Sequence, residues 1–166
     1  PENFRRNGFS IDEYVNGTNR YTAGQWVRAG YAMIDHPIES WHLRVIMGAR
    51  LENSTQTIRT RDLTNTQAID VSKDYVDVLP SANLVYSPWE SANFRAAYSQ
   101  TLNRPELREL APFSYYDFNT QYTLTGNPNL SRGIIRNYDL RAEFFPGAGE
   151  VLSVSVFYKA ISNAIE

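Results

Sequence analysis

The stretch YDLRAEFFPGAGEVLSVSVFYK, residues 138–159, alternates between apolar and polar positions on both sides of a turn. Tyr138, Leu140 and Phe144 alternate with Asp139, Arg141 and Glu143, and the same period continues from Leu152 to Lys159. Strict alternation predicts β-strands, because successive side chains of a strand point to opposite faces. We therefore expect a hairpin with one apolar face, which meets either a protein core or lipid.

Two further pairs of runs show the same period. WVRAGYAMID and WHLRVIMGARLE are joined by HPIES, and YVDVLPSANLVYS and ANFRAAYSQT are joined by PWES. In each pair the apolar positions share parity, odd with odd or even with even, so each hairpin can close with a single apolar face. In the first pair this places Ala29, Tyr31 and Met33 on the face of Leu43, Val45 and Met47. Pro80 cannot donate a ladder hydrogen bond and predicts an irregularity in its strand.

The connections alternate in length. The segments 1–25, 53–73 and 102–135 are long, polar and without period, whereas HPIES, PWES and PGAGE are short. Transmembrane β-barrels have this asymmetry, with short periplasmic turns and long extracellular loops. The sequence thus predicts an all-β fold, an antiparallel transmembrane barrel segment of about six strands in three hairpins. Aromatic residues near the short turns, such as Trp41, Trp89 and Phe144, fit an interfacial girdle.

Parity then assigns residues to the two faces of the barrel wall. The positions predicted to face lipid are Leu43, Val45, Met47, Leu84, Ala96, Leu140, Val154 and Val156. The positions predicted to line the lumen are Arg44, Arg95, Asp139, Arg141 and Glu143. Charges are costly against lipid but are tolerated in a wide, wet lumen.

Composition excludes several classes of protein. The 166 residues carry a net charge of −2, so electrostatics do not favour nucleic-acid binding. No cysteine is present, which removes disulfides and thiolate chemistry. The sequence contains no run of 18 apolar residues, so it does not predict a transmembrane helix. His36 and His42 flank a short turn without other ligands in metal-binding spacing, and we find no catalytic motif. We expect no enzyme activity, no metal and no cofactor.

The motifs resemble a known family. LPSANLVYSPWESANFRAAYSQTLNRPELREL, GNPNL, NYDLRAEF and SVFYKAISNAIE are similar in order and spacing to the barrel of TonB-dependent outer-membrane receptors, especially those of Bacteroidetes. AGYAMID and VIMGARLEN resemble the preceding hairpin of these barrels, so the similarity extends over most of the chain.

The resemblance implies a barrel of roughly 22 strands with a plugged lumen, in the outer membrane of a Gram-negative bacterium. We interpret residues 1–166 as an internal part of that barrel, without the plug domain and the closing strand. The implied function is uptake of a scarce ligand (siderophore, cobalamin, glycan or peptide) driven by TonB. The implied partners are outer-membrane lipid, the TonB energy complex through the plug, and a possible surface lipoprotein.

The stretch NRPELRELAPFSYYDFNTQYTLTGNPN is the richest candidate for a ligand site. RPELREL has leucines at helical spacing and predicts one helical turn. Aromatic faces bind sugars or apolar ligands, and Asn orients hydroxyl groups, which makes a platform of Tyr115, Tyr116, Phe118, Tyr122 and Asn127 conceivable. Packing of these residues against the barrel rim is the simpler interpretation. A soluble or surface-attached β-sandwich that binds glycans is the alternative function, and it requires a second sheet over the apolar face.

Overall fold

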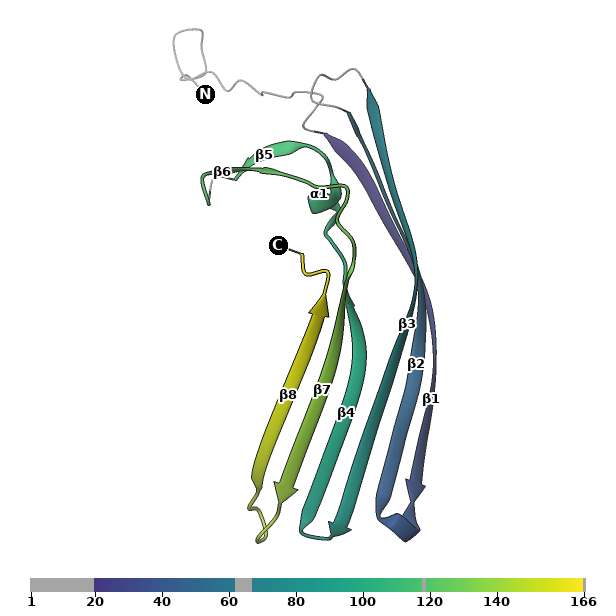
Figure 1. Ribbon diagram of the computed structural model, residues 1–166, viewed down its shortest axis with the longest axis vertical. Coiled ribbons are helices and arrows are strands. Elements are labelled where there is room, and N and C mark those ends of the chain that lie inside the picture. Colours follow the sequence, from purple (N-terminus) through teal and green to yellow (C-terminus); the bar gives the residue numbers. More distant parts are fainter. Residues whose placement is uncertain (1–19, 62–66, 118, 166) are drawn as a thin grey trace, which may run out of the picture.

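The computed structural model describes residues 20–61, 67–117 and 119–165 and consists almost entirely of β-structure. Six long strands form one antiparallel sheet in the order β1-β2-β3-β4-β7-β8. Their bounds are Tyr21–Ile38 (β1), Leu43–Arg61 (β2), Ala68–Trp89 (β3), Ala92–Asn103 (β4), Gly133–Phe144 (β7) and Leu152–Ser162 (β8). Figure 1 shows them as a curved wall with β1 and β8 at its two edges.

The predicted three hairpins and the all-β class are confirmed, and the sheet is not closed into a barrel. The 3₁₀ turn Glu39–Trp41 joins β1 to β2. The long connection between β4 and β7 contains the helical turn α1 (Leu107–Leu110), predicted from its leucine spacing, and a small hairpin of β5 (Ser114–Asp117) and β6 (Tyr122–Thr125). In Figure 1 these elements lie to one side of the wall, beside its upper part.

The segment 53–73, predicted to be a long loop, is mostly strand. β2 continues to Arg61 and β3 begins at Ala68, and the two pair without interruption. The prediction failed because only apolar positions were counted. The period of two persists in burial, since Glu52, Ser54, Gln56, Ile58 and Thr60 are buried and the residues between them are not. The backbone ladder itself requires no apolar side chain.

The first hairpin pairs in a register different from the predicted one. Met33 lies opposite Gly48 and Ile34 opposite Met47, so odd positions of β1 pair with even positions of β2. Ala29, Tyr31 and Met33 therefore do not share the face of Leu43, Val45 and Met47. β1 has apolar residues at both parities, Ile34 and Ile38 included, so its pattern alone did not define the register.

Pro80 does not interrupt its strand. It pairs in register with Ala49 of β2, while the pairing of β3 with β4 ends at the next residue, Ser81. A proline is tolerated here because β3 and β4 are not paired at this position, although β4 continues to Asn103, so its missing N–H breaks no ladder bond to β4. The irregularity lies instead between Tyr86 and Trp89, where the register with β4 shifts.

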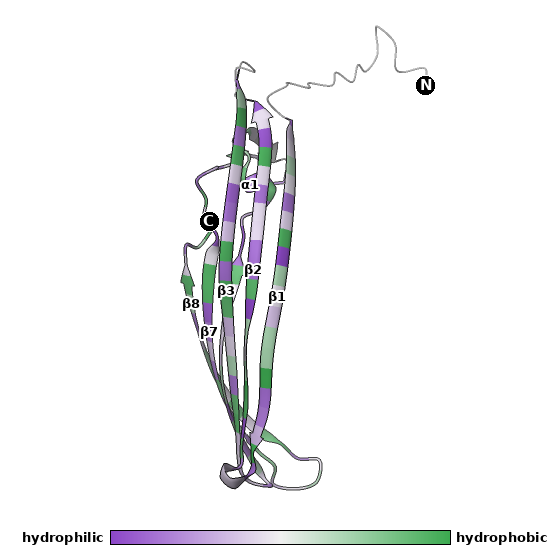
Figure 2. Ribbon diagram, turned by 90° about the vertical axis from the view of Figure 1, so that its right-hand side faces the viewer, coloured by the Kyte–Doolittle hydropathy of each residue, from purple (hydrophilic) through white to green (hydrophobic). Residues whose placement is uncertain are grey.

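The sheet has two faces, which we name by what covers them. The inner face bears Ile58 and is covered in its upper half by the connection between β4 and β7. The outer face bears Met47, Leu84 and Leu140, which remain exposed. In Figure 2 hydrophilic and hydrophobic residues alternate along β1, β2 and β3, as two faces of opposite character require.

Candidate functional site: a charged inner face covered by a folded loop

The lower half of the inner face carries ion pairs. Arg44 pairs with Asp35 across the first hairpin. Glu143, which is 9% exposed, forms ion pairs with Arg141 at 2.8 Å and with Arg95 at 3.4 Å. The register places Arg44, Arg95 and Arg141 on one face, because Val85 lies opposite both Arg44 and Arg95, and Arg95 lies opposite Arg141.

Asp139 belongs to the same face, since it pairs with Ala97 of β4 and Phe157 of β8. The five positions predicted to line the lumen thus share a face. That this face encloses a lumen stays a prediction.

A second ionic cluster lies higher on the inner face. Its members are Arg50, Glu52, Asp77, Arg104 and Arg132, which we call the rim cluster. Glu52 accepts hydrogen bonds from Arg50 and Arg104, both at 2.6 Å. Asp77 accepts from Arg132 at 2.5 Å and lies 3.8 Å from Arg104. The guanidinium of Arg132 also lies 4.2 Å from the ring centre of Tyr75, a cation–π contact.

The rim cluster fixes the connection between β4 and β7 at both of its ends. Arg104 follows the last residue of β4, and Arg132 precedes the first residue of β7. Glu52 and Asp77, on the neighbouring strands β2 and β3, are 8% and 4% exposed. Carboxylates buried to this degree require partners, because an uncompensated buried charge is strongly destabilising. Both ends of the loop 104–132 are therefore attached to the wall by charge.

Apolar packing holds the middle of the loop. Ile58 of β2 forms a small core with Leu110, Ala111 and Phe113 of the loop. The ring of Phe113 stacks on Tyr21 of β1 at 5.2 Å. α1 is stabilised at its start by a capping box of Glu106 and Glu109. The Gln56 amide donates to the carbonyl of Pro105 at 3.1 Å. The loop thus folds back onto the inner face of β1 to β3.

The GNPN turn closes this loop against α1. A Cβ on Gly126 would lie 2.0 Å from the Ala111 carbonyl oxygen, so only glycine fits. The backbone N–H of Asn127 donates to the carbonyl of Glu109 at 2.6 Å. The side-chain oxygen of Asn127 accepts from the N–H of Asn129, an Asx turn. The contacts of Asn127, one of the predicted ligand residues, thus stabilise the loop.

The other predicted ligand residues lie on the small hairpin. Tyr122 is in β6 and is 71% exposed. Tyr115 and Tyr116 are in β5, where their backbones pair with Leu124 and Thr123, but their side chains lie outside the described part of the structure. Phe118 lies outside the described residues altogether. The ligand platform therefore stays a prediction.

The eight positions predicted to face lipid share the outer face. One row of paired residues crosses five strands and contains Val45, Leu84, Ala96, Leu140 and Val156. On the same face of β2, Leu43 pairs with Tyr86 and Met47 pairs with Ala82. Val154 joins this face through Ala142, which lies opposite Phe94. Leu140, Val154 and Val156 are each more than 60% exposed. Contact of this face with lipid stays a prediction.

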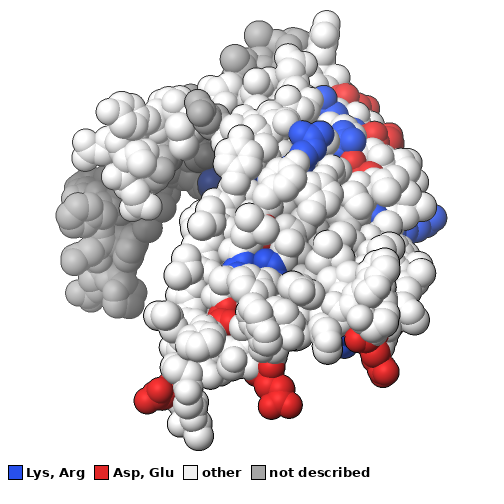
Figure 3. Space-filling model, turned by 60° about the horizontal axis from the view of Figure 1, so that its bottom comes forward, with Lys and Arg blue, Asp and Glu red and all other residues white. Residues whose placement is uncertain are grey.

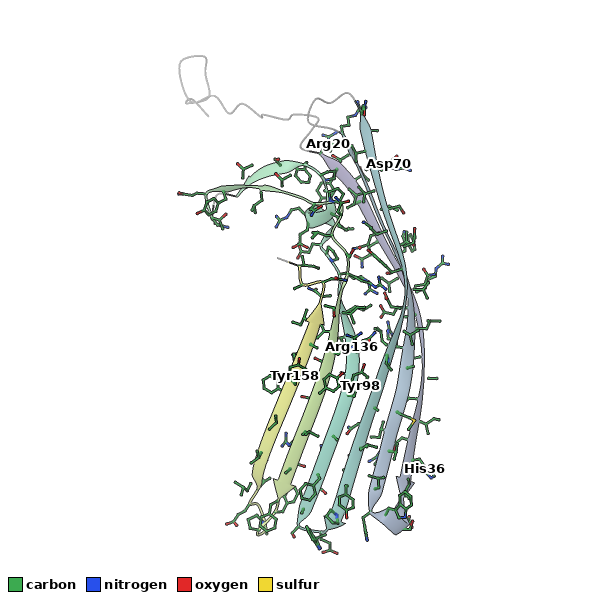
Figure 4. All side chains as sticks on the ribbon, viewed as in Figure 1. Arg20, His36, Asp70, Tyr98, Arg136 and Tyr158 are labelled. Carbon is green, nitrogen blue, oxygen red and sulfur yellow. The ribbon has the colours of Figure 1, made fainter. Side chains whose placement is uncertain are left out.

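A row of three tyrosines crosses the upper edge of this apolar surface, which the sequence pattern did not single out. Tyr98, Tyr138 and Tyr158 pair across β4, β7 and β8, with ring centres 5.1 and 6.1 Å apart. Their common parity with Leu140 was readable in the sequence, but their alignment depended on the β4–β7 register. Figure 4 shows Tyr98 and Tyr158 at mid-height of the wall, with Arg136 just above them. Such tyrosine rows suit a membrane interface, because the ring is apolar and the hydroxyl is polar.

The short turns form the lower edge of the wall, and this edge is charged. Each carries an exposed glutamate, namely Glu39, Glu90 and Glu150. Figure 3 shows acidic groups along the lower edge of the molecule. Exposed carboxylates at the turns indicate that this end of the wall is in water.

Two negative findings apply to the part of the chain that the structure describes. Residues 20–61, 67–117 and 119–165 contain no group of three or more His, Asp or Glu side chains arranged to hold a metal ion. Within the same ranges no helix has the length and apolar character needed to cross a membrane.

Comparison with protein families decides the class. The model of the outer membrane protein beta-barrel family matches residues 2–166. The chain belongs to this family. No curated protein matches it significantly. Membership in the outer membrane protein beta-barrel family places the chain in the outer membrane of a Gram-negative bacterium.

Family membership also decides against the sandwich fold that the alternative function requires. A soluble sandwich would cover the apolar face with a second sheet, and the other sheet among the described residues is the two-stranded β5–β6 hairpin. The residues of the outer face, such as Leu140 and Val156, have no such cover. The β-sandwich fold of this alternative is therefore wrong.

Proposed function

We propose that this chain forms part of the barrel wall and the outer loops of a TonB-dependent receptor. In this proposal the intact protein takes up a scarce ligand from outside the cell, and the TonB complex supplies the energy through a plug domain. The support is the resemblance of the LPSANL, GNPNL and NYDLRAEF motifs to these receptors, within a chain that belongs to the outer membrane barrel family.

The observation that carries the proposal is the rim cluster together with the loop it attaches. Loop 104–132 folds onto the inner face, and ionic groups such as Glu143 and Asp77 occupy that face at several heights. A narrow barrel fills its interior with its own side chains and has no space for a folded loop. A wide barrel with a wet or plugged lumen accommodates both the loop and the charges.

The proposal includes no covalent chemistry for these residues. Exposed Tyr122 and the small hairpin β5–β6 would meet the ligand or the plug at the outer opening, and a surface lipoprotein is a possible partner there. The ligand class stays open between siderophore, cobalamin, glycan and peptide. Outer-membrane lipid would surround the outer face.

TonB coupling can be tested on the intact purified protein. Isothermal titration with the periplasmic domain of TonB should show saturable binding, and planar bilayers containing the protein should show no steady conductance, because a plug closes the lumen. Steady ohmic conductance without binding of TonB would identify an open diffusion channel and reject the proposal.

The orientation is tested separately. Consecutive strands reverse direction, so the connections β2–β3 and β4–β7 emerge on the side opposite the three short turns, and we propose that this side is extracellular. On whole cells, an epitope inserted after Asn119 in the intact protein should bind antibody, and one inserted after Gly147 in the β7–β8 turn should not. Labelling at Gly147 alone would invert the orientation.

A further inference from the structure

The apolar outer face is not flat over β3, β4 and β7. Two adjoining cavities of about 470 and 330 Å³ lie on it, and both are lined by Leu84, Ala96 and Leu140. Ala82 and Ala142 also line the cavities, and the small alanine side chains leave space between the larger residues that line them. Together the cavities make one groove, which begins at Tyr86 and Phe94 near the short turns and ends at Tyr98 and Tyr138.

A positively charged side chain, that of Arg136, lies beyond the upper end of this groove. Arg136 is the next residue of β7 on the same face after Tyr138, and it lies opposite Gln100. Its side chain is exposed and makes no ion pair or hydrogen bond with any described residue. By contrast, Arg44, Arg95 and Arg141, on the inner face of the same sheet, all have carboxylate partners. Arg136 is therefore available for an anion from outside the chain.

We infer that the groove and Arg136 form a binding site for one phosphorylated lipid of the outer leaflet. An acyl chain fills the alanine-floored groove. The hydroxyls of Tyr98 and Tyr138 lie at the level where chain and headgroup meet. The guanidinium of Arg136 binds a phosphate of the headgroup, for which its planar donor set is well suited. The inference rests on family membership and the proposed orientation, and does not depend on TonB-coupled uptake.

The chain offers matched controls for both halves of the site. Arg28 also lies on the outer face and has no ion pair within the described residues. It pairs with Asn53, 25 positions later, and Arg136 pairs with Ala160, 24 positions later, so both lie about equally far from their hairpin turns. Ala32 is an outer-face alanine of β1 that lines neither cavity.

The test uses the intact protein in detergent, mixed with diphosphorylated lipid A or with phosphatidylcholine, and counts retained lipid by native mass spectrometry. We expect one retained lipid A per protein and much weaker retention of phosphatidylcholine. Arg136→Gln and Ala96→Phe should each lower the retention of lipid A by about tenfold. Arg28→Gln and Ala32→Phe should leave it unchanged.

Several results would overturn the inference. Equal retention by wild type, Arg136→Gln and Ala96→Phe would show that no such site exists. Equal losses in the control variants would show a general effect of charge or bulk on the outer face. Displacement of lipid A by millimolar inorganic phosphate would show a simple anion site. None of these results would bear on TonB binding or on the epitope test, so the proposed function would stand or fall separately.

Discussion

The lower and upper halves of β2 and β3 use the same two faces in opposite ways. In the lower half the outer face is apolar, from Leu43 to Leu51 on β2, and the inner face carries charges. In the upper half the outer face carries Thr55, Thr57 and Arg59, and the inner face buries Ile58. The change occurs at Glu52 and Asp77, where the rim cluster lies. The same backbone ladder thus serves two environments.

The length of the lower half fits a membrane. The nine residues 43–51 on β2, at ~3.3 Å per residue and a tilt of roughly 40°, rise about 23 Å, close to the ~25 Å apolar band of outer-membrane barrels. We propose that the outer face meets lipid only up to this level. Above it, the folded loop supplies apolar cover to the inner face. In this proposal the partner of each face, lipid or loop, determines the polarity pattern, while the strand itself continues unchanged.

The largest expected effect comes from a substitution on the apolar outer face of the lower half. Met47→Arg, in the middle of the apolar band, should lower the free energy of unfolding by roughly 2–4 kcal/mol, because it places a charge against lipid. Thr55→Arg, on the same strand and the same face but above the band, should change it by less than about 0.5 kcal/mol. Urea unfolding of the intact protein in liposomes measures both. Equal losses of unfolding free energy in the two variants would contradict a boundary between the two halves of the outer face.

The next largest effect comes from a substitution beneath the loop in the upper half. Ile58 is 1% exposed beneath the loop, and Ile58→Ala should cost about 2 kcal/mol of the free energy that holds the loop on the wall. Limited proteolysis should then cut within loop 104–132 faster, while the barrel stays folded. Ile46→Ala, lower on the same face and only partly buried, is the control and should leave the cleavage rate unchanged. Loss of barrel assembly in Ile58→Ala would show that the two halves are not separable.

A smaller effect tests the boundary itself. Asp77→Asn removes the charge that binds Arg132 and should weaken loop attachment by about 1.5 kcal/mol, at the low end for charged hydrogen bonds because Arg132 is partly exposed. Hydrogen exchange of the loop amides should rise accordingly. Asp70→Asn breaks the exposed pair with Arg59 on the outer face of the same strand and should cost at most about 0.3 kcal/mol. A larger cost for Asp70→Asn than for Asp77→Asn would contradict the assigned burial.

The sequence predicted the faces of the lower half well except on β1, whose register was wrong, and it predicted the upper half poorly. Leu140, Val154 and Val156 alternate with Arg141 and Ser155, so one face could be assigned from period alone. In residues 53–61 the buried positions include Ser54, Gln56 and Thr60, which look like solvent-exposed residues. Their cover comes from residues 105–113, about 50 positions later, and no local pattern contains that contact.

The residues of the candidate site likewise differ in whether the sequence alone could place them. Arg95, Arg141 and Glu143 could be placed on one face from the sequence, because they alternate with apolar residues at fixed parity, and their place in a lumen stays a prediction. The rim cluster was missed, because Arg104 and Arg132 lie in the aperiodic connection and meet Glu52 and Asp77 only after the loop folds back. An arginine next to each end of a long connection was the available signal.

The most direct test of the central claim measures the environment of both halves on one face of β2. The chain contains no cysteine, so a spin label at position 47 or at position 55 reports one site each within it. In liposomes the label at 47 should relax with dissolved oxygen and be protected from a water-soluble nickel reagent, and the label at 55 should show the reverse. Exposure of position 47 to the water-soluble reagent would contradict the account, since the apolar half of the outer face would then not meet lipid.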